Sequence, residues 1–112
     1  MKIHTRSAAI VGLSMLLGAC GGGLREPTAA DASLAAQRWP GTTVSTLNEG
    51  RALYVRRCGT CHSLYAPAEF AEPEWRASIA EMRDRAHVQP REEDLILKYL
   101  VAVGAPRGPH SP

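Results

Sequence analysis

Two cysteines and a histidine stand close together near the middle of this 112-residue chain. They lie in the stretch 56–65, RRCGTCHSLY, in which Cys58 and Cys61 are three positions apart and His62 follows directly. Thiolate sulfur and imidazole nitrogen are ligands for transition metals, and a thiolate is also a nucleophile. Side chains of these types at this spacing can bind a metal, exchange with a disulfide, or bond covalently to a cofactor.

Each of these chemistries makes a further demand on the chain. A zinc site needs four ligands, and downstream of the motif only His87 and His110 could complete it. A thioredoxin-like dithiol needs a β-α-β context, but no stretch alternates as a strand does. Cys-x-x-Cys-His as c-type haem attachment needs no further residue. We therefore expect one covalent haem c, with thioether bonds to Cys58 and Cys61 and with His62 as the proximal axial ligand.

Three helices are predicted around the motif, over 48–57, 73–86 and 90–103. Proline opens the second and third, and acidic residues follow the start of the third, which suits the helix dipole. Their apolar faces consist of Leu53 and Tyr54 in the first helix, Trp75, Ile79, Met82 and Ala86 in the second, and Ile96, Tyr99, Leu100 and Val103 in the third. The predicted fold class is all-α.

The predicted folded unit, residues 47–106, is small. A unit of this size rarely builds an adequate hydrophobic core unaided, and a covalently attached haem would give the helices a large apolar plate to pack around. Residues 107–112 are rich in Pro and Gly and are expected to form a disordered tail. Residues 20–46 are rich in small residues, so we expect a flexible tether, in which Trp39 either packs onto the domain or stays exposed.

Over about residues 47–103 the chain resembles the class I cytochrome c family. The resemblance rests on the LILKYL stretch at 95–100, which is similar to that family's last helix, and on the pattern Gly50-x-x-x-Tyr54-x-x-x-Cys58-x-x-Cys61-His62. It implies a small three-helix fold wrapped around one haem. It also implies a close crossing of the first and last helices, with Gly50 against Tyr99.

The resemblance further implies a second axial ligand, which in most of the family is a methionine ahead of the last helix. Met82 is the methionine in that region and is expected to be the distal ligand, although a methionine on an apolar helix face is usually a core residue. His87 and an open or water-bound iron are the alternatives. His110, in the tail, is expected to be exposed.

The start of the chain predicts export and a membrane anchor. A basic beginning and an apolar run over 8–17 are typical of a signal peptide, here 1–19. Leu17-Gly18-Ala19-Cys20 resembles the bacterial lipobox, which implies lipidation of Cys20 and a place on the periplasmic side of the cell envelope. Gly21 after the cysteine slightly favours the outer membrane. An ordinary signal peptide cut near Ala19 is the alternative.

The charge balance and the motif reduce the number of functions that this chain could have. The chain has thirteen basic and eleven acidic residues, and removal of Lys2 and Arg6 with the leader would leave eleven of each. Because the mature chain would then be close to neutral, a nucleic-acid partner is not expected. With both axial positions filled, the expected function is single-electron transfer between transient redox protein partners, without a small-molecule substrate. A haem enzyme, a gas-binding sensor with an open distal site, and a fixed subunit of a larger oxidoreductase are the alternatives.

Overall fold

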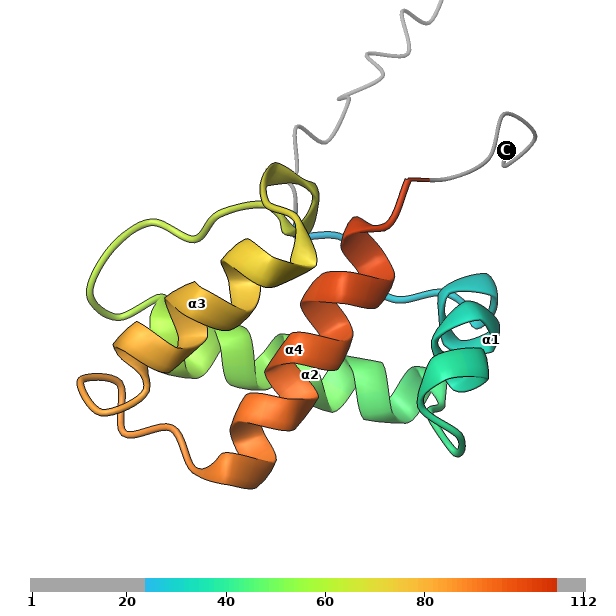
Figure 1. Cartoon of the computed structure of the whole chain (residues 1–112), viewed down its shortest axis with the longest axis horizontal. Helices are drawn as coiled ribbons and strands as arrows, with labels where there is room; N and C mark the ends of the chain where they lie inside the picture. The colour runs from blue at the N-terminus through green and yellow to red at the C-terminus, as the bar shows by residue number, and fades with distance from the viewer. Residues whose placement is uncertain (1–23, 107–112) are drawn as a thin grey trace, which may run out of the picture.

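The computed structural model describes residues 24–106, which contain four α-helices, one short 3-10 helix and no strand (Figure 1). In chain order the elements are α1 (Ala29–Arg38), α2 (Val44–Cys58), η1 (Pro67–Glu69), α3 (Glu72–Met82) and α4 (Pro90–Gly104). The predicted all-α fold class is confirmed for this part of the chain. Within it, no helix is both long and apolar enough to span a bilayer. The predicted leader 1–19, Cys20, His110 and the tail 107–112 lie outside the described residues.

Helices α2 and α4 cross at the centre of the domain (Figure 1). At the crossing Gly50 lies so close to α4 that a Cβ atom on it would be 2.1 Å from the Leu95 carbonyl oxygen and 2.9 Å from Tyr99 Cβ. The expected contact between Gly50 and Tyr99 is therefore confirmed. The core extends from this crossing, and its most buried side chains are Leu47, Ile96, Tyr99 and Leu100.

Two helix boundaries differ from the predicted ones by four residues, and the others agree to within one. α2 begins at Val44 rather than at residue 48, because Thr43 accepts a hydrogen bond from the Thr46 backbone N–H at 3.1 Å and so caps an earlier turn. α3 ends at Met82 rather than at residue 86. The chain turns over the next residues, where His87 takes a left-handed φ of 52°, which a continuing α-helix does not allow.

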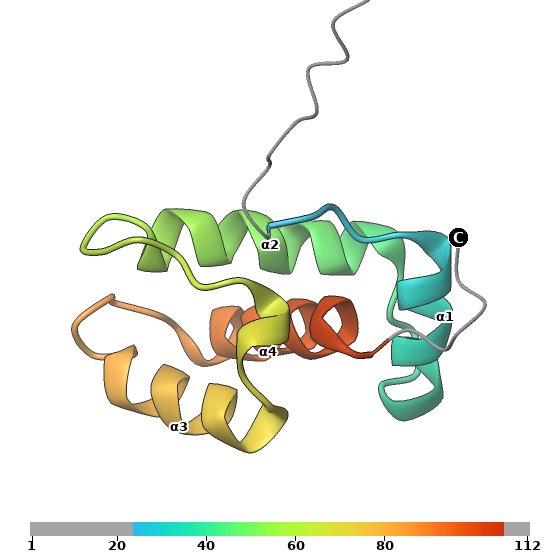
Figure 2. The same ribbon diagram turned by 90° about the horizontal axis from the view of Figure 1, so that it is seen from above.

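A fourth helix, α1, lies where a flexible tether was expected, so that expectation is wrong for residues 24–46 (Figure 2). We call residues 24–43 the N-terminal strap. Thr28 and Asp31 form a reciprocal capping box at the start of α1, which favours a helix despite the small side chains. Ala32 and Ala35 pack with Leu47 and Ala102, and the partly buried Trp39 joins this second cluster.

A partly buried ion pair lies at the start of the strap. The Arg25 guanidinium donates to both carboxylate oxygens of Asp31, at 2.6 and 2.7 Å, and to the Val103 carbonyl oxygen at 3.0 Å. These bonds, with those from Thr28, lower the pKa of Asp31 to about 2. Because the folded-state pKa lies below the usual value, the stabilisation is complete above about pH 4 and is lost as the pH falls toward 2.

Gly50→Ala tests the helix crossing. Glycine to alanine within a helix normally stabilises by up to about 1 kcal/mol, but here the new methyl group would overlap the backbone of α4. We expect a loss of about 2 kcal/mol or more in the free energy of unfolding, measured by urea titration. Ala52→Leu, on the exposed side of the same helix, is the control and should change it by less than about 0.5 kcal/mol. A more stable Gly50→Ala protein would contradict the close approach.

Candidate functional site

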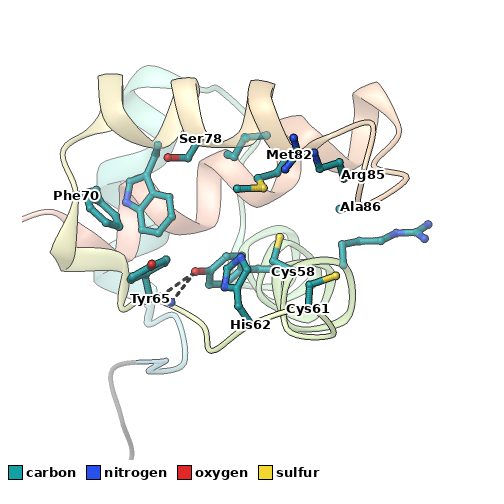
Figure 3. A pocket seen from close by; sticks show the side chains of 13 residues that line it. Cys58, Cys61, His62, Tyr65, Phe70, Ser78, Met82, Arg85 and Ala86 are labelled. Atoms are coloured by element: carbon teal, nitrogen blue, oxygen red, sulfur yellow. Dashed lines mark hydrogen bonds between the residues drawn. The ribbon is translucent and has the colours of Figure 1, made fainter.

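A cavity of about 410 Å³ lies between the last turns of α2, the loop that follows it, and α3 (Figure 3). Cys58, Cys61 and His62 line one wall, and Met82 lies on the wall opposite. Ile79 is also a lining residue. Tyr54, Tyr65, Phe70 and Trp75 also line the cavity. The structure therefore brings the cysteine and histidine motif and Met82, which are distant in sequence, to one space.

The motif straddles the end of α2. Cys58 is the last residue of the helix and is half-buried, whereas Cys61 and His62 lie in the exposed turn that follows. The His62 Nδ1 atom is 2.7 Å from the Ser63 carbonyl oxygen. Since a carbonyl oxygen can only accept, this contact favours the proton on Nδ1 and leaves the lone pair of Nε2 free to bind a metal.

Met82 lies at the open end of the apolar face of α3. Trp75 and Ile79, further back on that face, are buried, but Met82 is 37% exposed and lines the cavity. His87, the alternative ligand, is exposed and is not among the residues that line the cavity. Of the two candidate distal ligands, the fold places Met82 across from the motif.

Both thiols of the motif are free. Burial, and to a smaller extent the neighbouring Cys61, raises the pKa of the Cys58 thiol. A thiol with a raised pKa is less reactive at neutral pH, unlike the attacking cysteine of a dithiol redox pair. The zinc interpretation also gains no support, because within residues 24–106 no three His, Cys, Asp or Glu side chains gather at one point.

An aromatic cluster holds the loop that closes the cavity. The Tyr54 hydroxyl donates to the Tyr65 carbonyl oxygen at 3.0 Å and accepts from the Tyr65 backbone N–H at 3.2 Å. The indole N–H of Trp75 donates to the Pro67 carbonyl oxygen at 3.1 Å, and Phe70 packs edge-on against both Tyr65 and Trp75. Burial raises the pKa of Tyr54 to about 12, so this phenol stays protonated and able to donate up to strongly alkaline pH.

Sequence reasoning missed several residues that line the cavity. Tyr65 and Phe70 were not singled out, although aromatic residues in a short loop after the motif were a visible signal. Arg57 and Arg85 were missed as well, and no carboxylate is among the described residues that line the cavity. Arg57 donates to Glu92 at 2.8 Å, which lowers the pKa of Glu92 and ties the end of α2 to the start of α4.

Comparisons with protein-family models, with curated proteins and with solved structures give no match to this chain. The function must therefore be argued from the motif and from the geometry of the cavity.

Tyr54→Phe tests how the cavity loop is held. The substitution leaves the backbone N–H and carbonyl of Tyr65 without their partner, so we expect a loss of about 1–3 kcal/mol in the free energy of unfolding. Tyr65→Phe is the matched control, because within the described residues the Tyr65 hydroxyl makes no hydrogen bond. Equal stability of the two variants in urea unfolding would contradict this role for Tyr54.

Proposed function

We propose that this chain is a mono-haem c-type cytochrome that carries single electrons between redox proteins outside the cytoplasm. The observation that carries the proposal is the pairing of Cys58, Cys61 and His62 on one wall of the cavity with Met82 on the wall opposite (Figure 3).

The residues present suit a haem. The cavity volume of about 410 Å³ falls in the range of cofactor sites, roughly 300–1,000 Å³. Its walls are largely apolar, with Ile79, Phe70 and Trp75 among the lining residues, as an apolar macrocycle requires. The donor set is also suitable: two thiols for covalent attachment, an imidazole and a thioether.

Each residue then has a separate role. Cys58 and Cys61 would hold the group by thioether bonds, so that it cannot dissociate. His62 would bind through Nε2 while its Nδ1 donates to Ser63, a hydrogen bond that orients the ring and increases its basicity. Met82 would bind from the end of α3. Haem held in this way supplies reversible one-electron exchange between ferric and ferrous iron.

The surroundings of the cavity favour a carrier over an enzyme. If His62 and Met82 both bind the iron, no coordination position would remain open for a substrate. The lining residues include no carboxylate to act as a general acid or base. The exposed motif turn at Cys61 and His62 offers a place for a redox partner to dock closely and briefly.

The proposal includes lipidation at Cys20 and attachment to a membrane on the periplasmic side of the cell envelope. The basic start, the apolar run and the residues before Cys20 support this part.

Intact-mass analysis tests the proposal. The full chain, matured in a host that makes c-type cytochromes, should carry the mass of one haem, and Cys58→Ser with Cys61→Ser should abolish it. The reduced protein should show the absorption bands of a low-spin haem c. Full-length protein that carries no haem after such expression would overturn the proposal.

Met82→Ala and His87→Ala test the second axial ligand. We expect Met82→Ala to remove the weak near-infrared band of sulfur-to-iron ligation from the ferric protein. The ferric variant should then bind cyanide readily, and the reduced variant should bind carbon monoxide readily. His87→Ala, at an exposed residue that does not line the cavity, should keep the wild-type spectrum. A high-spin wild-type protein that already binds carbon monoxide would favour the gas sensor or haem enzyme instead.

A further inference from the structure

The first described residues lie directly on the central helix pair. The guanidinium of Arg51, in α2, donates to the Leu24 carbonyl oxygen from Nε at 3.2 Å and from an Nη atom at 3.1 Å. The Tyr99 hydroxyl, in α4, donates to the Arg25 carbonyl oxygen at 3.1 Å, and the Leu24 side chain packs against the main core. The chain is thus fixed to the domain from Leu24 onward.

The ion pair of Arg25 and Asp31 lies within the strap and orients Arg25 toward α4. Asp31 is only 5% exposed, and its carboxylate takes hydrogen bonds from Arg25 and from the backbone and side chain of Thr28. The guanidinium held in this way also donates to the Val103 carbonyl oxygen at the end of α4, and that bond ties the strap to the domain.

The other end of the strap is also held. Arg38, the last residue of α1, forms an ion pair with Glu72 at the start of α3, and its guanidinium lies 4.6 Å from the centre of the Trp39 ring. The N-terminal strap is therefore attached to α2, α4 and α3 rather than lying free beside them.

This attachment shortens the chain available between Cys20 and the domain. A free segment from Cys20 to Leu47 would have a root-mean-square span of about 28 Å and could stretch to about 90 Å. With the strap docked, only the four steps from Cys20 to Leu24 remain, and these reach at most about 14 Å.

We infer that the N-terminal strap holds the domain at the surface of the membrane, so that it exchanges electrons only with redox partners that lie in, or come close to, that same membrane. The inference rests on the proposed lipidation of Cys20. Arg51 lies seven residues before Cys58 on α2, which is about 10 Å along the helix. The Arg51 side chain and its hydrogen bond to Leu24 add about 10 Å, so the end of α2 that carries the motif stays within about 35 Å of the lipid.

The reach can be measured with the lipidated holoprotein in phosphatidylethanolamine and phosphatidylglycerol vesicles that contain a lipid with a fluorescent headgroup. Haem quenches a nearby fluorophore, so quenching reports how close the domain stays to the surface. One variant carries about 20 Gly and Ser residues inserted between Gly22 and Gly23. The insertion lengthens the segment between Cys20 and Leu24 and leaves the strap unchanged. Asp31→Ala removes the carboxylate that orients Arg25 and so weakens the strap. Arg91→Ala, in an exposed ion pair with Glu49, is the control.

We expect strong quenching with the wild-type and Arg91→Ala proteins, loss of most of it with the lengthened chain, and a smaller loss with Asp31→Ala. Acylated wild-type and lengthened proteins that quench equally would overturn the inference while leaving the cytochrome proposal intact. A mass spectrum that shows no acyl chains on Cys20 would overturn the anchor and, with it, the inference. Absence of haem by mass would instead count against the proposed cytochrome function.

Amide hydrogen exchange tests the docked strap independently of the lipid. The α1 amides should be protected in the wild-type protein and should exchange roughly 10 to 100 times faster in Asp31→Ala, with the Arg91→Ala protein unchanged. Unprotected α1 amides in the wild-type holoprotein would overturn the inference.

Discussion

The contact of α2 with α4 at Gly50 is the constraint on which the rest of the structure depends. A hydrogen atom in place of a side chain lets the two helix backbones meet, and Tyr99 packs beside the gap. The crossing fixes the direction of α2, and hence the position of its last residue, Cys58. The strap and α3 pack against the same pair of helices, so their positions also depend on this crossing.

A second close approach places the opposite wall of the cavity. A Cβ atom on Gly104 would lie 2.2 Å from the Pro67 carbonyl oxygen, so η1 rests on the end of α4. The same carbonyl accepts the Trp75 indole N–H, which links η1 to α3 and thereby sets the position of Met82 seven residues later. The cavity lies between two helices that are each held against α4. α2 contacts α4 at Gly50, and α3 is joined to α4 through Pro67, which rests on Gly104.

The sequence predicted the local features better than the long-range ones. The motif, the all-α class, the cores of three helices and the Gly50 contact with Tyr99 followed from spacing and from resemblance. Helix α1 was missed because its buried face consists of alanines and an aspartate, which carry little hydrophobic signal. Its stability comes from partners far along the chain, such as the Val103 carbonyl that accepts from Arg25, and no local pattern reveals them. The aromatic residues of the loop after the motif were visible in the sequence, but their places around the cavity were not.

The strap shows how a small domain can use a segment of low hydrophobicity. Alanine side chains let α1 approach α2 and α4 closely, and the ion pair between Arg25 and Asp31 supplies directional bonds where apolar area is limited. Arg51, which holds Leu24, and Cys58 lie on the same helix. The distance between the bound strap and the motif is therefore constant. A helix that presents the cysteine and histidine motif at its end therefore also determines how far that motif stands from Leu24.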